Sequence, residues 1–169
     1  AGYAMRGGEI YVQGNAGYRA GVHMKAYKEK FPVVVIGGCA GTACTVSDLV
    51  YGVPAAGTMA HSWVQMFDSE YEAFACYCKT YPDNAVLLVD TFDTLRSGVP
   101  NAIRAFNNVL KPLGITRCGI RLDSGDMAYL TKRAREMLDE AGWTECRITV
   151  SNSLDERLIR DLIRQGAKI

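Results

Sequence analysis

The sequence has no long hydrophobic run, no excess of charge of either sign, and only two histidines. Its most apolar stretches, Val33–Ile36 and Ala85–Val89, are far shorter than the roughly 20 residues that a membrane-spanning helix requires. The 19 lysines and arginines are scattered among 18 acidic residues, whereas nucleic-acid-binding proteins usually carry a basic stripe. We therefore expect neither a membrane nor a nucleic-acid partner.

The composition is that of an ordinary globular protein, with 49% hydrophobic and 22% charged residues among 169. A chain of this length forms one domain with a single core, so we expect residues 1–169 to be one domain. The six cysteines lie among apolar residues, and no targeting segment opens the chain. This pattern predicts reduced, mostly buried thiols in a cytoplasmic protein.

The two ends of the sequence suggest a fragment. The chain opens on Ala1 rather than methionine, and Gly166–Ile169 resembles the end of a helix followed by the start of a strand.

Strand-like runs alternate with helical patterns along the chain. The expected strands are Val33–Gly37, Ala55–Ala60, Ala85–Val89, Arg117–Leu122 and Arg147–Ser151. The expected helices are Gly17–Glu29, Thr42–Val50, Glu70–Thr80, Val99–Leu110, Asp126–Ala141 and Asp155–Gln165. Such alternation predicts an α/β fold of parallel βα units, either an open sheet or a barrel. A complete barrel needs about 250 residues, so a barrel here would be partial.

Polar residues and glycines follow the carboxyl end of each expected strand, which is the edge where α/β proteins bind ligands. The segment Arg121–Asp126 is the most informative. Arg121 offers a planar fork for phosphate or carboxylate, Asp123 could bind a ribose hydroxyl, and Gly125 lets a ligand approach the backbone. An equally simple interpretation is that Asp123 or Ser124 caps the next helix while Arg121 pairs with a neighbouring acid.

Two further positions could carry chemistry. His61 follows an expected strand, and an imidazole there can act as an acid, a base or a phosphate acceptor. Asp90 follows Val89 directly and could bind Mg²⁺ or stabilise a developing cation, whereas we expect Asp93 to be a structural helix cap.

Several blocks together resemble the nicotinate phosphoribosyltransferase family. They are GTMAHSW (57–63), FDSEYEAF (67–74), LLVDTFDTLRSGVPNAI (87–103), GIRLDSGDMAYLTKRAREMLDEAG (119–142) and SNSLDE with QGAKI (151–169). The resemblance runs from about Gly37 to Ile169, and residues 1–32 match poorly.

The resemblance implies a partial, TIM-like barrel of the type II phosphoribosyltransferase fold, in an enzyme that is a homodimer when complete. It implies the reaction of nicotinate with 5-phosphoribosyl 1-pyrophosphate, which gives nicotinate mononucleotide and pyrophosphate in NAD synthesis. It also implies Mg²⁺, bound with the pyrophosphate substrate, and coupling to ATP through a phosphohistidine.

By the same resemblance, the catalytic residues are His61, which is phosphorylated, Asp90, which supports it, and Asp123. No dedicated protein metal ligand is expected. The implied substrate-binding residues are Thr42, Ser62, Arg121, Ser124, Gly125, Ser151 and Asn152. The N-terminal domain and a glycine-rich segment of the family have no counterpart here, so we expect the fragment alone to be inactive.

Two alternatives remain. The chain could come from a pyridine phosphoribosyltransferase that acts on nicotinamide or quinolinate. The nicotinamide enzymes carry an acid just after the position of Thr42, where this chain has Ala43-Cys44, and quinolinate enzymes need a denser basic pocket. The other alternative is a non-catalytic α/β ligand-binding domain.

Overall fold

The structure is a computed structural model that describes residues 9–12, 33–36, 45–52, 54, 55 and 57–169. Its contacts divide the chain into two compact units. Unit 1 contains residues 1–57 and 153–156, and unit 2 contains residues 58–152 and 157–169.

In unit 1, strands β1 (Glu9–Val12) and β2 (Val33–Ile36) form a parallel pair in which Glu9 lies opposite Val33. Helix α1 (Thr45–Tyr51) follows and ends before Gly52, which has a φ of +64°. The expected strand at Val33 and the helix that follows it are confirmed, whereas β1 was not predicted. The expected helix at Gly17–Glu29 lies outside the described residues.

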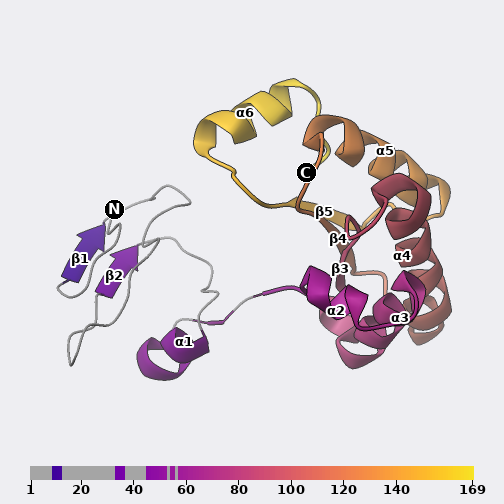
Figure 1. The fold of residues 1–169 in the computed structure, drawn as a ribbon, viewed down its shortest axis with the longest axis horizontal. Coiled ribbons are helices and arrows are strands. Elements are labelled where there is room, and N and C mark those ends of the chain that lie inside the picture. The colour runs from indigo at the N-terminus through magenta and orange to yellow at the C-terminus, as the bar shows by residue number, and fades with distance from the viewer. Residues whose placement is uncertain (1–8, 13–32, 37–44, 53, 56) are drawn as a thin grey trace. The chain divides into compact units, whose positions relative to one another are not determined.

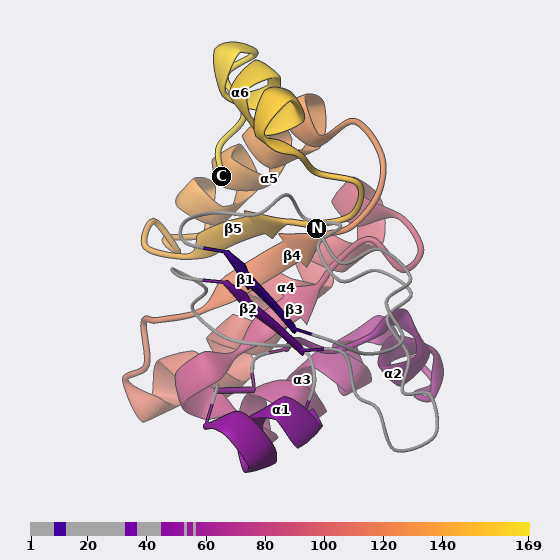
Figure 2. The ribbon, with the colours of Figure 1, turned by 90° about the vertical axis from the view of Figure 1, so that its left-hand side faces the viewer.

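Unit 2 is built on a parallel sheet in the order β3 (Val86–Leu88), β4 (Gly119–Leu122) and β5 (Arg147–Val150). Figure 2 shows β5, β4 and β3 from top to bottom. Gly119 lies opposite Val86 on one side and Arg147 on the other, so the strands are in step. The predicted α/β class is confirmed, and all three expected strands of this sheet are present.

Helical segments connect the strands of unit 2. Short α2 (His61–Gln65) precedes α3 (Glu70–Thr80) and η1 (Pro82–Asn84), and α5 (Met127–Glu140) joins β4 to β5. Helix α6 (Glu156–Arg164) follows β5. Figure 1 shows α3, α4 and α5 on the same side of the sheet.

The connection between β3 and β4 is longer and less regular than predicted. It consists of η2 (Thr94–Gly98), α4 (Val99–Ala105), η3 (Phe106–Leu110) and η4 (Lys111–Leu113), where η2 and η3 are π-helical turns. The helical segment therefore starts five residues before the expected Val99, and Asp93 caps it by accepting hydrogen bonds from the amides of Leu95 and Arg96. The structural role expected for Asp93 is confirmed.

The core lies between the sheet and these helices. Leu87 and Leu88 in β3 and Ile120 in β4 are fully buried, Ile148 in β5 is nearly so, and they belong to one core cluster with Phe74 and Phe106. The predicted apolar stripe of α5 also faces the core, since Ala134 and Leu138 are fully buried and Met127, Leu130 and Ala141 pack against them. Because burying a large aliphatic or aromatic side chain stabilises a fold by roughly 1.5–3 kcal/mol, this layer holds unit 2 together.

The thiols of the described residues are reduced, as predicted. Cys76, Cys78, Cys118 and Cys146 are free, and the last three are buried. Burial raises the pKa of the Cys78 thiol to about 12. A hydrogen bond with Cys118 and burial also raise the pKa of Cys146, so both thiols are protonated and unreactive at neutral pH.

The expected strand at Ala55–Ala60 is wrong. Among the described residues of this segment, Ala55 makes a single strand-like bridge, and Gly57–Ala60 is irregular up to the start of α2. The segment AAGTMA has a single β-branched residue and a glycine, a composition with little preference for strand structure.

In the part of the chain that the structure describes, no helix has the length and apolar character needed to cross a bilayer.

Candidate active site

Three polar side chains meet at the carboxyl edge of the unit 2 sheet. Asp90 lies two residues after β3, Asp123 directly follows β4, and Ser151 directly follows β5. Because the strands are parallel, their carboxyl ends lie at the same edge of the sheet. Two backbone hydrogen bonds hold the three chain segments together at this edge, from Val89 N to Arg121 O (3.1 Å) and from Ser151 N to Leu122 O (2.9 Å).

Arg121 is the centre of a hydrogen-bond network at this edge. Its Nε donates to Ser151 Oγ at 2.8 Å, one terminal nitrogen donates to Asp123 Oδ1 at 2.9 Å, and the other donates to Thr58 Oγ1 at 2.5 Å. A guanidinium has five N–H donors, so these contacts fix its plane and leave one N–H on each terminal nitrogen. Arg121 is therefore held in one orientation with donors still available to an anion.

Asp123 accepts hydrogen bonds from both Arg121 and the Ser151 hydroxyl. These two partners hold the pKa of the Asp123 carboxyl below its usual value, and the Ser151 hydroxyl contributes more than Arg121 does. Partial burial opposes this shift. Asp123 is thus a carboxylate at neutral pH, and its second oxygen, Oδ2, lies 3.7 Å from His61 Nε2.

Asp90 is a buried carboxylate with one oxygen in use. Oδ2 accepts hydrogen bonds from the Asp123 amide (2.9 Å) and the Ser124 hydroxyl (2.6 Å), so it ties the end of β3 to the loop after β4. Oδ1 is buried and has no hydrogen-bond partner among the described residues. A buried, unpaired polar atom costs stability and calls for an explanation.

His61 is the first residue of α2, and its side chain is 40% exposed. Its Nδ1 lies 3.1 Å from Thr91 Oγ1, and Nε2 faces Asp123. The imidazole is therefore oriented from one side by a hydroxyl and from the other by a carboxylate. Its partners are Thr91 and Asp123, whereas the Asp90 carboxylate is bonded to the loop after β4.

The loop after β4 has the backbone geometry that the sequence suggested. Gly125 has a φ of +88°, a conformation that favours glycine. Asp126 caps α5 by accepting a hydrogen bond from the Tyr129 amide, so neither Asp123 nor Ser124 is needed as the cap. The structural interpretation of this segment expected Arg121 to pair with a neighbouring acid. Arg121 does so, and the acid is Asp123, which itself belongs to the network at the sheet edge.

Of the other predicted site residues, Asn152 contacts this network, whereas Ser62 has no hydrogen bond to it among the described residues. The Asn152 side chain donates to the Asp123 carbonyl at 3.1 Å, and its backbone has a φ of +73°. Ser62 is exposed on α2 next to His61. Thr42 lies outside the described residues.

Two members of the network were not predicted. Thr58 contacts Arg121, and Thr91 contacts His61. Both lie in segments that the sequence singled out, since Thr58 belongs to GTMAHSW and Thr91 follows Asp90. Their roles depend on contacts between distant segments, which spacing along the chain does not reveal.

The donor set fits a divalent cation that arrives with a phosphorylated ligand. Carboxylate oxygens are the ligands that Mg²⁺ prefers, and Asp90 Oδ1 is free to accept one. Among the described residues, no group of three or more potential ligand side chains could enclose a metal ion. Mg²⁺ commonly binds to one or two carboxylates together with substrate phosphates, which is compatible with this edge.

An oriented arginine, two carboxylates and a histidine at the carboxyl edge of a parallel sheet define a class of protein. It is that of α/β proteins with a charged, polar ligand site at the carboxyl edge of the sheet.

Comparison with known proteins narrows this class. No family model matches the chain. It is 50% identical over 137 residues to nicotinate phosphoribosyltransferase of Bacillus subtilis (strain 168), covering 80% of this chain and 27% of the relative. It is 43% identical over 128 residues to nicotinate phosphoribosyltransferase pncB2 of Mycobacterium tuberculosis (strain ATCC 25618 / H37Rv), covering 76% and 27%. The Dictyostelium discoideum nicotinate phosphoribosyltransferase is 33% identical over 179 residues, covering 79% and 30%.

The resemblance to the nicotinate phosphoribosyltransferases is therefore confirmed over about four fifths of the chain. The chain spans about a quarter of the length of these curated relatives.

Proposed function

We propose that this chain carries part of the active site of a nicotinate phosphoribosyltransferase. The enzyme joins nicotinate to 5-phosphoribosyl 1-pyrophosphate and releases nicotinate mononucleotide and pyrophosphate, as a step of NAD synthesis. The observation that carries the proposal is the network of Arg121, Asp123 and Ser151 at the sheet edge, in a chain 50% identical to such an enzyme.

The chemistry of the reaction matches the charges at this edge. The pyridine nitrogen attacks the anomeric carbon of the ribose while the bond from that carbon to the pyrophosphate oxygen breaks. Positive charge develops on the sugar and negative charge on the leaving group. Asp123, held as a carboxylate by Ser151 and Arg121, stabilises the sugar. The remaining N–H donors of Arg121 bind phosphate oxygens.

Mg²⁺ would neutralise charge on the pyrophosphate group and would be held by its oxygens together with Asp90. The buried Oδ1 of Asp90 supports this assignment, because a carboxylate oxygen without a protein partner is suited to a cation or to a water bound to one.

Binding of the phosphoribosyl substrate is the first test. Titration calorimetry of this chain with 5-phosphoribosyl 1-pyrophosphate and Mg²⁺ is expected to show binding that Arg121→Gln weakens at least tenfold. Loss of a charge-assisted hydrogen bond costs about 1.5–3 kcal/mol, which corresponds to roughly that factor or more. Arg133→Gln, on an exposed position of α5 paired with Glu136, is the matched control. Equal affinity for wild type and Arg121→Gln would refute the assignment.

Coupling to ATP is assigned to His61. A phosphoryl group passes from ATP to Nε2, a nitrogen–phosphorus bond forms and ADP leaves. Thr91 occupies the other ring nitrogen, and the exposed side chain allows access, both of which support this role. In the complete enzyme, His61→Ala is expected to abolish ATP hydrolysis coupled to product formation while slow transfer without ATP persists. ATP coupling that survives His61→Ala would contradict the role.

The same resemblance supports three proposals for the complete enzyme: a TIM-like barrel of which β3, β4 and β5 form a part, a homodimeric assembly, and a cytoplasmic location. The three parallel βα units of unit 2 are compatible with a barrel segment.

A further inference from the structure

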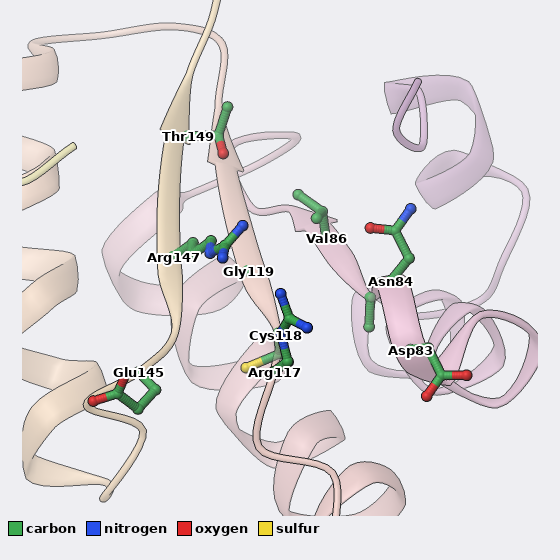
Figure 3. Close-up of a pocket in the computed structure, with 10 residues that line it drawn as sticks. Asp83, Asn84, Val86, Arg117, Cys118, Gly119, Glu145, Arg147 and Thr149 are labelled. Atoms are coloured by element: carbon green, nitrogen blue, oxygen red, sulfur yellow. The ribbon is translucent and has the colours of Figure 1, made fainter. Parts of the chain in front are cut away.

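A hollow of about 350 Å³ lies at the end of the unit 2 sheet opposite the candidate active site. It is lined by residues at or just before the start of each strand, among them Asn84, Arg117, Gly119 and Arg147 (Figure 3). Because the strands are parallel, this amino-terminal edge is separated from Asp90, Asp123 and Ser151 by the length of the strands. The hollow is therefore a second place on unit 2 where a ligand could bind.

Gly119 forms the floor of the hollow. It lies in one row across the sheet with Val86 and Arg147. A methyl group at Gly119 would come within 3.3 Å of the Arg147 carbonyl oxygen and 3.4 Å of a Val86 methyl group. A side chain at this position would therefore be crowded by both neighbouring strands.

Two arginines, Arg117 and Arg147, and two acids, Asp83 and Glu145, line this space. Arg117 and Arg147 are exposed, and among the described residues neither guanidinium takes part in an ion pair or a hydrogen bond. In Figure 3 both guanidinium groups lie beside the centre of the hollow, whereas the carboxylates of Asp83 and Glu145 point away from it. Because neither guanidinium has a partner among the described residues, the N–H donors of both remain available to an anion.

We propose that this hollow is an anion site that binds a phosphate group between Arg117 and Arg147. Each guanidinium offers a planar pair of N–H donors that matches two phosphate oxygens. The Asn84 amide and the Thr149 hydroxyl, which also line the hollow, supply further donors. The volume exceeds that of a lone phosphate and lies in the range of small-molecule sites, so the group can be part of a phosphorylated small molecule. The site is independent of the proposed reaction at the opposite edge.

The test is an NMR titration of the ¹⁵N-labelled chain with inorganic phosphate, at constant ionic strength maintained with chloride. The amide signals of Gly119 and Arg147 are expected to shift and to saturate. The double variant Arg117→Gln/Arg147→Gln is expected to bind at least tenfold more weakly. Arg121→Gln, which alters the opposite edge, and Arg133→Gln are expected to leave these shifts unchanged. A second titration with ribose 5-phosphate identifies the source of the phosphate: tighter binding indicates a phosphorylated small molecule, and equal binding indicates the phosphate group alone.

Three results would overturn the site. They are shifts confined to the loop after β4, shifts that chloride reproduces, and saturation that the double variant retains. Failure at this edge alone, with Arg121-dependent binding of 5-phosphoribosyl 1-pyrophosphate intact, would leave the proposed function standing.

Discussion

Asp123 joins most of the groups at the candidate active site. It contacts Arg121, Ser151 and His61 through its side chain, and its amide donates to Asp90. A single residue therefore couples the ends of all three strands to the start of α2. Its ionisation should influence both the stability of the edge and any ligand that binds there.

Ser151→Ala is expected to raise the pKa of Asp123, because the Ser151 hydroxyl is the main group that lowers it below the usual 3.8. A carboxyl group whose folded pKa is depressed contributes stability above its unfolded pKa, and this contribution is lost as the pH falls through the folded pKa. The melting temperature of the variant should therefore lie below that of the wild type at neutral pH, and the difference should shrink below about pH 4.

The pKa itself can be read from the carboxyl ¹³C signal of Asp123 during an acid titration. Ser62→Ala, at an exposed position on α2, is the matched control and should leave the pKa unchanged. An Asp123 pKa that is the same in Ser151→Ala and the wild type would show that the hydrogen bond does not hold this carboxylate.

At the residue scale, the sequence predicted the members of the site that have unusual chemistry in a recognisable motif. Arg121, Asp123 and His61 were all identified in this way, and the structure brings them together. Thr58 and Thr91 were missed because hydroxyl residues are common and become informative only through a contact partner. For the same reason, the partners of His61 followed from the folded geometry alone.

At the scale of elements, a close backbone approach joins Gly98, the last residue of η2, to Val89, which directly follows β3. A methyl group added to Gly98 would lie 1.8 Å from the Val89 carbonyl oxygen, so only glycine lets the two backbones pass so closely. This contact holds the start of the helical segment against the strand that precedes Asp90.

Gly98→Ala is accordingly expected to lower the free energy of unfolding by at least about 2 kcal/mol, since rigid backbone cannot yield as a side chain would. Urea denaturation followed by circular dichroism measures this change. Gly57→Ala is the matched control, because a methyl group there meets nothing within 4 Å. A destabilisation of equal size in both variants would contradict the close approach.

Regular elements were predicted well where hydrophobic periodicity was long and caps were clear. The helix at Glu70–Thr80 has the expected bounds, and α5 differs from the expected Asp126–Ala141 only by its capping residues. The predictions failed where tertiary contacts outweighed local preference. The π-helical turns on both sides of α4 have no signature in the spacing of apolar residues, and the described residues Gly57–Ala60 form no strand.

At the scale of the whole molecule, the two edges of the unit 2 sheet have different character. The carboxyl edge combines a paired arginine with two carboxylates and a histidine, whereas the amino-terminal edge holds two unpaired arginines beside a hollow. The parallel βα units could be predicted from the alternation of strands and helices. The total number of strands in the complete sheet could not be predicted, because the chain corresponds to about a quarter of the length of its relatives.

The central claim is that the carboxyl edge serves nicotinate phosphoribosyl transfer, and a chimera tests it most directly. Residues 58–152 of this chain would replace the matching segment of the Bacillus subtilis nicotinate phosphoribosyltransferase, to which the chain is 50% identical. Formation of mononucleotide would then be measured with nicotinate, nicotinamide and quinolinate.

The chimera is expected to convert nicotinate in preference to the other two pyridines. Arg121→Gln within the chimera is expected to lower kcat/KM at least a hundredfold, whereas Arg133→Gln is not. A folded chimera that forms no nicotinate mononucleotide, or one that keeps its rate after Arg121→Gln, would contradict the claim.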